Sequence, residues 1–587
     1  MLHPRHRWVL PVTPVIDPEL RAAAVSRGLS DRLISLLGAR GVVSPADLDA
    51  WFAPPEAALH DPGLLPDAMR VRQRIAQARS RGERVMVFGD FDADGLTGLA
   101  ILVRALRSLG LDVMPYVPSR LDEGHGLSTA SVSAASDRGA SLIVTVDCGS
   151  TSGPEIAAAG RLGIDVIVTD HHRVPATLPP ALAIVNPHRP DATYPDRRLA
   201  GSGVAFKVAS LLLGDEPNGP SLAASFADLA AVGTVADVAP IVGENRAIAR
   251  MGLARLRSAP QPGLAALLGR AGIAAASVDL ETVGFAIAPR LNAAGRIGEA
   301  GDAAALLLAD DPTEAAALAD RLEGVNATRR DVLRAALAEA RDVLERAVSG
   351  DGAIRPAVVL RGPWPIGVVG LVAGRLAEES GRPAVVGAEL GDVVRASCRS
   401  GGSMDLGLAL DACADLFVRH GGHAGAAGFE IATDGWAAFE TRFLALAADL
   451  PAPDAQSVLR IDVAVSASDV GYPLLRELAT LAPFGPGHPD PLVAILGLTV
   501  MRARVATGGH AQLVLRKERD VLDGIAFGWP ELAEAVAEGD RVDIVGRLVS
   551  RTFAGNETLQ IDVRDAAPAG TQTVPGASVP VLAGATG

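Results

Sequence analysis

Arg84-Val85-Met86-Val87-Phe88-Gly89-Asp90-Phe91-Asp92-Ala93-Asp94-Gly95 is a short apolar run that ends in three aspartates, at every second position, and a glycine. Apolar, β-branched runs of this length are typical of buried strands. Residues 96–109 follow with helical periodicity and end at Gly110, which predicts a helix. The aspartates therefore lie on a strand-to-helix turn, at the carboxyl end of a strand, where open α/β sheets bind their ligands.

Two later strand ends carry the same kind of side chain. Residues 142–146 run into Asp147, and residues 166–169 run into the triplet Asp170-His171-His172. We expect parallel neighbouring strands that bring these groups into one crevice. Ionised carboxylates a few ångströms apart repel one another strongly unless a cation compensates their charge. Oxygen ligands combined with imidazole favour Mn²⁺ or Mg²⁺ over a thiolate-preferring ion.

The spacing of Asp90, Asp92 and Asp94 also suggests a calcium EF-hand loop. That loop needs a bidentate glutamate at its twelfth position, where this chain has Ile101, and it follows a helix rather than a strand. The EF-hand is therefore excluded. A solvated acidic turn remains the alternative for this motif by itself, and the three strand ends together favour the metal site.

The length and charge of the chain restrict the class of protein. A length of 587 residues predicts three or four domains rather than one core. The net charge of −14 argues against a protein that coats duplex nucleic acid indiscriminately, because such proteins are normally basic. A local arginine-lined channel is compatible with this charge, since part of the negative charge belongs to the acidic cluster.

Cysteine usage and hydropathy exclude two further classes. Cys148, Cys398 and Cys413 are widely separated and form no pair motif, so neither a disulfide scaffold nor a zinc ribbon is expected, and a reducing cytosol is predicted. Residues 221–243 are apolar but include Asp228 and Asp237. Each costs about 2.5–3.5 kcal/mol at the centre of a bilayer, so we predict no membrane span.

Alternation of strands and helices over residues 76–260 predicts an α/β domain whose parallel sheet is covered on both faces. Residues 261–350 are rich in alanine and leucine, which predicts a helical connector. Within them, residues 312–348 are expected to form a long helix that joins two lobes. Residues 351–452 repeat the α/β pattern and predict a smaller second lobe.

The remaining segments flank these two lobes. Residues 453–566 contain five or six short strands and one helix, a pattern typical of an OB-like β-barrel. We expect residues 1–75 to form a small segment packed on the 76–260 domain. Residues 567–587, rich in proline, glycine, alanine and threonine, are expected to be a disordered tail.

Five motifs in this order resemble those of the DHH phosphoesterase superfamily and its DHHA1 domain. They are Gly-Asp-Phe-Asp-Ala-Asp-Gly (89–95), Val-Asp-Cys-Gly (146–149), Asp-His-His (170–172), Gly-Thr-Val-Ala-Asp-Val (233–238) and Gly-Gly-His-Ala-Gly-Ala-Ala-Gly (421–428). Three further features narrow the resemblance to the RecJ family within it: Pro-Arg-Leu-Asn-Ala-Ala-Gly-Arg (289–296), Trp364 with residues 367–376, and Pro483-Phe484-Gly485 beside a terminal barrel. The resemblance covers about residues 60 to 565.

The resemblance implies a single-stranded-DNA-specific 5′→3′ exonuclease that acts in DNA repair and recombination. Two Mn²⁺ or Mg²⁺ ions would activate a water that attacks the phosphodiester, and 5′-mononucleotides would be released. The barrel would guide the strand, mostly through its backbone, because aromatic residues make up only 4% of the chain. The implied partners are single-stranded DNA with a 5′ end, a single-stranded-DNA-binding protein and a RecQ-type helicase, with a cytoplasmic monomer as the expected state and no membrane partner.

The resemblance also implies roles for individual residues. The metal ligands would be Asp90, Asp92, Asp147, His171 and Asp237. Among the other catalytic residues, Asp94 would be a further ligand or an orienting neighbour of the metals. Asp170 and His172 would lie behind the ligands or touch the scissile phosphate. The substrate would be gripped by Arg120, Arg290, Ser397, Arg399 and His423. One position departs from the family: Pro365 follows Trp364 where a histidine is usual.

Two other functions remain as alternatives. A DHH-type phosphatase or nano-RNase that acts on very short oligonucleotides or cyclic dinucleotides would resemble only the first two lobes, so the barrel argues against it. A catalytically silent DNA-binding scaffold would typically lack metal-ligand motifs, and all of them are present here.

Overall fold

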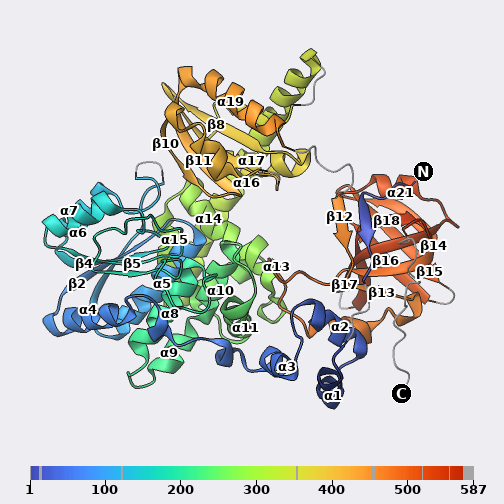
Figure 1. Cartoon of the computed structure of the whole chain (residues 1–587), viewed down its shortest axis with the longest axis horizontal. Helices are drawn as coiled ribbons and strands as arrows, with labels where there is room; N and C mark the ends of the chain where they lie inside the picture. Colours follow the sequence, from blue (N-terminus) through green and yellow to red (C-terminus); the bar gives the residue numbers. More distant parts are fainter. Residues whose placement is uncertain are drawn as a thin grey trace. The chain divides into compact units, whose positions relative to one another are not determined.

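The computed structural model describes residues 2–11, 16–120, 123–351, 355–402, 404–450, 457–517, 520–553 and 556–572. The chain divides into two compact units (Figure 1). One comprises Leu59–Ala239 and Gly243–Pro453, and the other comprises Met1–Ala58, Pro240–Val242 and Asp454–Gly587.

The first lobe is built on a five-stranded parallel sheet with the strand order β3-β2-β4-β5-β6. The strands are β2 (Arg84–Gly89), β3 (Asp112–Tyr116), β4 (Ala140–Val146), β5 (Asp165–Thr169) and β6 (Ala183–Val185). Their helices are α4 (Ala68–Arg81), α5 (Ala93–Ser108), α6 (Thr129–Asp137), α7 (Gly153–Arg161) and α8 (Gly201–Leu213). The central strands are buried on both faces, which explains their continuous apolar sequences.

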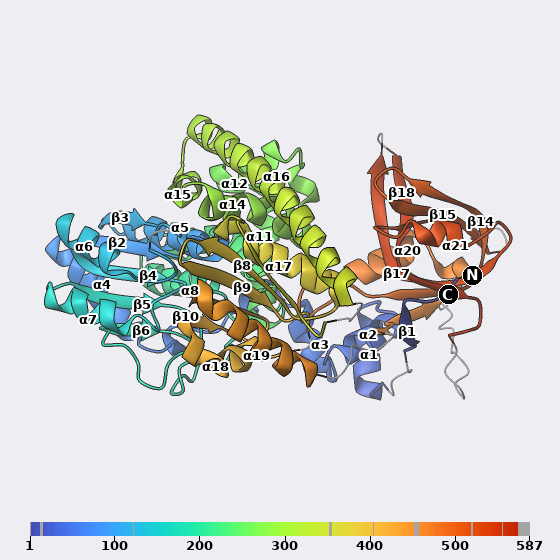
Figure 2. The same cartoon turned by 90° about the horizontal axis from the view of Figure 1, so that it is seen from above.

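A helical region follows the first sheet. It contains α9 (Gly219–Ser225), α10 (Ala227–Ala236), α11 (Gly243–Ser258), α12 (Pro262–Arg270), α13 (Leu280–Thr282), a π-helical turn (Val283–Ile287), α14 (Ala288–Ile297), α15 (Ala300–Leu308) and α16 (Pro312–Asp351). The last of these has 40 residues. It packs on α12, α14 and α15 and then on α17 of the second lobe, as Figure 2 shows.

The second lobe has a mixed five-stranded sheet with the order β10-β11-β9-β8-β7, in which only β7 and β8 are parallel. Its strands are β7 (Val358–Gly362), β8 (Ala384–Leu390), β9 (Val393–Arg399), β10 (Phe417–Gly422) and β11 (Ala426–Ala432). Its helices are α17 (Ile366–Ser380), α18 (Leu406–Asp411) and α19 (Trp436–Ala448).

The other unit contains a barrel closed by the pairing of β14 with β17. Its strands are β13 (Val463–Val465), β14 (Val493–Ala506), β15 (His510–Lys517), β16 (Asp520–Ala526), β17 (Arg541–Phe553) and β18 (Asn556–Pro568), and its helices are α20 (Tyr472–Ala479) and α21 (Glu531–Ala535). The predicted fold class, two α/β lobes joined by a long helix and followed by an OB-like barrel, is confirmed. The predicted tail begins too early, because β18 extends to Pro568; residues 573–587 lie outside the described part of the chain.

The N-terminal segment packs on the barrel, so its predicted packing on the 76–260 domain is wrong for residues Met1–Ala58. Strand β1 (His6–Val9) pairs in parallel with β12 (Ser457–Arg460), and the Trp8 indole donates a hydrogen bond of 2.7 Å to Asp565. Apolar side chains of α1 (Pro18–Ser26), α2 (Asp31–Ala39) and α3 (Pro45–Phe52) join the core of the barrel. Sequence periodicity shows that these helices have an apolar face but not which core buries it.

A buried ion pair fixes the loops around α8. The Lys207 ammonium lies 2.8 Å from Glu244, both side chains are almost fully buried, and burial lowers the pKa of Lys207. The second Glu244 oxygen accepts a hydrogen bond of 2.6 Å from the Tyr194 hydroxyl, and Lys207 also donates to the His60 carbonyl.

Among the described helices, none has the length and hydrophobicity of a membrane span.

We expect Glu244→Gln to lower the free energy of unfolding by about 3–5 kcal/mol, because it leaves the Lys207 ammonium buried without its counter-charge. Urea denaturation of the full chain measures this loss. Glu216→Gln is the matched control: Glu216 pairs with Arg79 at 2.6 Å on the surface, and its loss should cost less than about 1 kcal/mol. Equal losses in the two variants would contradict the prediction.

Candidate metal centre

The register of the first sheet aligns three of the acidic positions. Gly89 pairs with Val146, and Val146 pairs with Thr169, so β2, β4 and β5 end at the same level. The residues that follow continue the ladder: the backbone amides of Asp90, Asp147 and Asp170 donate to the carbonyl of the neighbouring strand at 3.3, 2.9 and 3.0 Å. Three carboxylates therefore stand side by side at the carboxyl edge of the sheet, as the sequence predicts.

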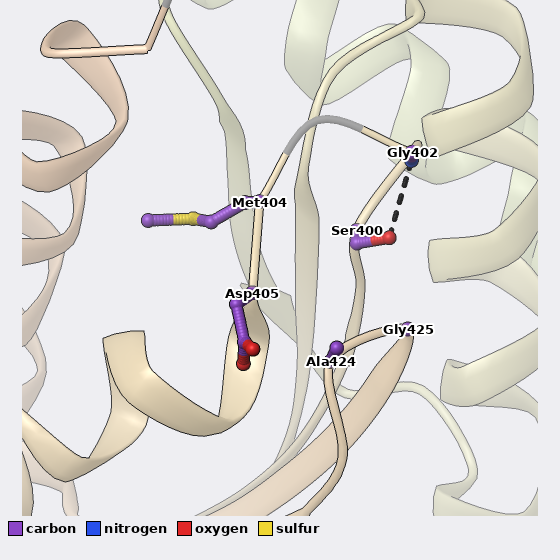
Figure 3. Close-up of a pocket in the computed structure, with 6 residues that line it drawn as sticks. All are labelled: Ser400, Gly402, Met404, Asp405, Ala424 and Gly425. Atoms are coloured by element: carbon purple, nitrogen blue, oxygen red, sulfur yellow. Dashed lines mark hydrogen bonds between the residues drawn. The ribbon is translucent and has the colours of Figure 1, made fainter.

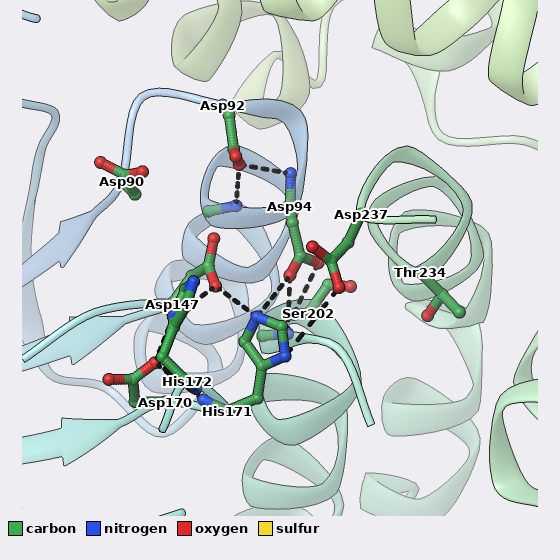
Figure 4. A network of polar contacts seen from close by, with 12 residues as sticks. Asp90, Asp92, Asp94, Asp147, Asp170, His171, His172, Ser202, Thr234 and Asp237 are labelled. Carbon is green, nitrogen blue, oxygen red and sulfur yellow. Dashed lines mark hydrogen bonds and ion pairs between the residues drawn. The ribbon is translucent and has the colours of Figure 1, made fainter. Parts of the chain in front are cut away.

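The fourth acidic segment of the centre is the end of a helix. Helix α10 packs on α5 and α8 and ends at Asp237, whose backbone amide closes the last helical turn. In Figure 4 the His171 imidazole lies between Asp147, Asp94 and Asp237. Its Nε2 is 3.0 Å from Asp147 Oδ1 and 3.8 Å from Asp94 Oδ2, and its Nδ1 is 3.9 Å from Asp237 Oδ2.

Potential ligand atoms form three overlapping groups, within each of which all atoms lie within 4.8 Å of one another. The groups are Asp90 with Asp92 and Asp147, Asp147 with His171 and His172, and Asp94 with His171 and Asp237. Asp147 and His171 each belong to two groups. This overlap suits a pair of cations that share ligands.

Two of the aspartates also organise the surrounding backbone. Asp92 is the N-cap of α5 and accepts hydrogen bonds of 3.0 Å from the amides of Asp94 and Gly95. Asp94 is buried, and its two oxygens accept from the amides of Gly201 and Ser202 at the start of α8, at 2.6 and 2.9 Å. The Asp94 carboxylate is therefore held in one orientation beside the other carboxylates.

Several buried polar atoms of the centre make no hydrogen bond with the described part of the chain. They are Asp90 Oδ1, Asp147 Oδ1 and His171 Nε2; the last two lie 3.0 Å apart but not in hydrogen-bond geometry. Buried polar atoms are nearly always satisfied, so such atoms gathered in one place require a partner. Their donor set of carboxylate oxygens and imidazole nitrogen fits Mn²⁺ or Mg²⁺.

The raised pKa values of the aspartates also favour a site for divalent cations. Burial, reinforced by the charges of Asp90 and Asp94, raises the pKa of Asp92 to about 6. Burial and the charge of Asp94 raise the pKa of Asp237 to about 7, and burial with the charges of Asp94 and Asp92 holds the pKa of Asp147 well above its usual range. Divalent ions bound here would stabilise the ionised forms of these carboxylates and lower their pKa values.

Asp170 and His172 form a separate ion pair at the rim. Burial disfavours the charged form of Asp170, but hydrogen bonding to His172 outweighs it and holds the pKa of Asp170 below its usual range. The same contact, at 2.8 Å, raises the pKa of His172 to about 9. His172 is half exposed and therefore presents a positive imidazolium at the edge of the acidic centre.

Arginines from distant segments face this centre. Burial lowers the pKa of Arg120, and the charges of Asp90 and Asp92 oppose that effect. Burial, together with the neighbouring positive charges of Arg120, Arg329 and Arg399, lowers the pKa of Arg296 to about 9. Three crowded guanidinium groups, Arg120, Arg296 and Arg399, thus form a positive cluster beside the carboxylates, which is typical of a phosphate site.

Arg399 of this cluster lies on β9, and Ser397 lies two residues before it on the same strand. A Cβ added to Gly370 of α17 would lie 3.2 Å from the Arg399 guanidinium and 3.3 Å from the Ser397 hydroxyl. A glycine at position 370 therefore leaves room for both side chains. Three of the five predicted substrate residues, Arg120, Ser397 and Arg399, are in this region.

Arg290 is placed differently. Its guanidinium donates from Nε to Glu323 of α16 at 2.5 Å and from Nη1 to the Ala286 carbonyl at 2.7 Å, so two of its donors are engaged in contacts around α14. Arg296, on the same helix, was not among the predicted site residues. Six residues rotate an α-helix by about 240°, so the two arginines face different directions. The stretch has no apolar period in the sequence, so its two faces could not be told apart there.

His423 lies on the predicted glycine-rich loop between β10 and β11. Burial and the positive charges of Arg399 and His172 lower the pKa of His423, so the loop faces the arginine cluster and the metal centre. An open cavity of about 370 Å³ adjoins this loop (Figure 3). The described residues that line it are Ser400, Gly402, Met404, Asp405, Ala424 and Gly425.

Pro365, the position that departs from the family pattern, caps the N-terminus of α17. The neighbouring Trp364 is buried, and its indole donates to Glu339 of α16 at 3.1 Å. Pro365 has no side-chain donor or acceptor and contributes no ligand to the centre.

Three family models match separate parts of the chain. Residues 84–234 match the DHH family, N-terminal domain, residues 356–449 match the DHHA1 domain, and residues 461–565 match the RecJ OB domain. They correspond to the parallel sheet with its helices, the mixed sheet and the barrel.

Several known proteins are similar to this chain over most of its length. The single-stranded-DNA-specific exonuclease RecJ of Bacillus subtilis is 34% identical over 572 residues, which cover 97% of this chain and 71% of that protein. The protein of the same name from Thermus thermophilus is 37% identical over 90% of this chain and 73% of its own length. The crystal structure of RecJ in complex with Mn²⁺ from Thermus thermophilus has a TM-score of 0.79 and 33% identity, and the match covers 96% of this chain and 80% of that chain. With such relatives over most of its length, the chain belongs to the RecJ family of single-stranded-DNA-specific exonucleases.

Proposed function

We propose that this protein is a metal-dependent exonuclease that degrades single-stranded DNA from its 5′ end and releases 5′-mononucleotides. The observation that carries this proposal is the overlap of the three ligand groups at Asp147 and His171, directly beside the arginine cluster. A centre for divalent cations next to a phosphate site is the arrangement that phosphodiester hydrolysis requires. The RecJ structures solved with Mn²⁺ and with Mg²⁺ support the choice of metal.

The proposed ligands are Asp90, Asp92, Asp147, His171 and Asp237. Divalent ions held by these residues would lower the pKa of a water and neutralise charge on the phosphate oxygens. Asp94 fixes the N-terminus of α8 against the centre, and an added Cβ at Gly201 would lie only 2.6 Å from the Asp147 carboxylate. The backbone thus holds Asp147 in one position.

The remaining polar residues bind and orient the strand in this proposal. The His172 imidazolium, held by Asp170, hydrogen-bonds the scissile phosphate. Arg120, Arg296, Arg399 and Ser397 bind the phosphate at the 5′ end, and His423 closes the site from the second lobe. A site that grips a terminal phosphate at a fixed distance from the metals explains both the polarity and the mononucleotide product.

Other parts of the proposal concern the cellular role. The barrel binds the single strand through electrostatic contacts with its backbone. The protein acts as a cytoplasmic monomer in DNA repair and recombination, together with a single-stranded-DNA-binding protein and a RecQ-type helicase. These statements rest on the family likeness and not on the geometry of the centre.

A time course on 5′-labelled and 3′-labelled DNA, single-stranded and duplex, tests the activity. With Mn²⁺ we expect the 5′ label to appear at once as mononucleotide from the single strand, the 3′ label to shorten progressively, and the duplex to persist. Chelation of the metal with EDTA should abolish all cleavage. Early release of a 3′ label, or turnover of dinucleotides but not of long strands, would contradict the proposal.

A further inference from the structure

The loop before α6 places an unassigned histidine against the metal centre. His125 lies between Gly124 and Gly126, whose φ angles of +77° and +80° are left-handed conformations that glycine adopts without strain. The His125 Nδ1 is 3.1 Å from Asp90 Oδ2. A carboxylate only accepts hydrogen bonds, so Nδ1 carries the proton and donates it to Asp90.

The two oxygens of Asp90 have different hydrogen-bond partners. Oδ2 accepts from His125, whereas Oδ1 is buried and makes no hydrogen bond with any residue that the structure describes. A ligand atom of Asp90 lies within 4.8 Å of those of Asp92 and Asp147. One oxygen is therefore anchored from the loop, and the other is left for a cation.

The imidazole is held in place by its surroundings. The ring centroid of His125 is 4.3 Å from that of Phe91, which is buried, and the Arg120 guanidinium lies 4.9 Å from the same Phe91 ring. The loop itself is tied down by Glu123, which accepts hydrogen bonds from the Tyr116 hydroxyl, the Ser119 amide and the Ser128 hydroxyl. A histidine that is exposed over most of its surface thus keeps a defined orientation.

We propose that His125 is a positioning residue for the metal centre: its Nδ1–H holds the Asp90 carboxylate so that Oδ1 points at the bound cation. This inference rests on the proposed function, because it assumes that Asp90 is a ligand. Hydrogen bonds that orient ligands contribute about 10–100-fold to metal affinity in other proteins. The contribution of His125 should be of that size.

Three variants of the full chain separate the hydrogen bond from simple packing. His125→Phe keeps an aromatic ring against Phe91 but removes the donor, and should weaken Mn²⁺ binding by at least about 10-fold. His125→Asn places an amide nitrogen near the position of Nδ1 and should restore most of the affinity. Electron paramagnetic resonance of free Mn²⁺, titrated without DNA, measures the affinity directly.

His420→Ala is the matched control, because His420 also lies 3.1 Å from an aspartate, Asp411, on the second lobe. It should leave Mn²⁺ affinity unchanged. In activity assays, saturating Mn²⁺ should restore the kcat of His125→Phe, while the KM for DNA stays near that of the parent protein. Melting temperatures measured without metal should be equal.

Two results would overturn the inference. One is an unchanged Mn²⁺ affinity in His125→Phe, and the other is an equal loss in His125→Phe and His125→Asn. If the parent protein binds Mn²⁺ and degrades single strands, either result removes only the role of His125. A parent protein that neither binds Mn²⁺ nor cleaves DNA would overturn the proposed function as well.

Discussion

Asp147→Asn is expected to abolish the cleavage of single-stranded DNA, with a loss in kcat of at least about 10³-fold. Asp147 belongs to two of the three ligand groups, so its replacement disturbs both proposed cation positions at once. The asparagine keeps the shape of the side chain but removes its charge and its stronger ligand oxygen. A bound metal contributes several kcal/mol to stabilisation of the transition state, and each 1.36 kcal/mol is a factor of about ten in rate.

Single-turnover cleavage of a 5′-labelled strand in Mn²⁺ measures the loss. The matched control is Asp228→Asn, which alters another fully buried aspartate of the same domain whose carboxylate accepts from the Leu229 and Gln261 amides. It should retain the nuclease rate even if its melting temperature changes. Asp147→Asn that remains folded and cleaves DNA at the parent rate would refute the ligand assignment.

The sheet-edge part of the centre could be predicted because it depends on strand periodicity and parallel order alone. An apolar run that ends in Asp90, a second in Asp147 and a third in Asp170 must bring these residues together once β2, β4 and β5 are parallel neighbours. The alternation of strands and helices predicts a parallel sheet, and the carboxyl ends of its strands lie at one edge. Asp237 was different. It ends a helix, and only the likeness to family motifs pointed to it.

The sequence does not predict helix α14, so it cannot predict which side chains lie on each face of that helix. Residues 289–296 contain many small side chains and follow a π-helical turn, so no apolar period marks α14 in the sequence. The family resemblance implies Arg290, and no apolar period in the sequence separates its face of the helix from that of Arg296. The packing of Met1–Ala58 was missed for a related reason, since an amphipathic helix does not identify the core that will bury it. The direction of the arginines and the core that buries the N-terminal helices both depend on tertiary contacts, which local sequence does not specify.

His125 illustrates a third limit. Its neighbours Gly124 and Gly126 indicate a turn, but the contact with Asp90 joins residues 35 positions apart through a loop. No spacing rule connects a loop histidine with a strand-end aspartate. The contact depends on the conformation of the loop between β3 and α6, which is defined only in the folded domain.

Arg296→Ala is expected to raise the KM for 5′-phosphorylated single-stranded DNA by about 100-fold, with a smaller change in kcat. Arg296 is half-buried near Arg120 and Arg399, and its guanidinium also donates to the Gly367 carbonyl at 3.2 Å, which fixes its direction. A charge-assisted contact with phosphate contributes up to about 3 kcal/mol, and about 1.4 kcal/mol corresponds to a factor of ten. Steady-state kinetics on 5′-phosphate and 5′-hydroxyl strands measure the effect, which should largely vanish on the latter.

Arg290→Ala provides the comparison within the same helix. Arg290 is tied to Glu323 and the Ala286 carbonyl, so its loss should lower the melting temperature and leave the KM within about 3-fold of the parent value. The opposite order, with a large KM increase in Arg290→Ala and none in Arg296→Ala, would return the phosphate-binding role to Arg290. Equal KM increases in both variants would mean that α14 acts as a unit, because a shift of the helix would then move Arg296 away from Arg120 and Arg399 whichever side chain is removed.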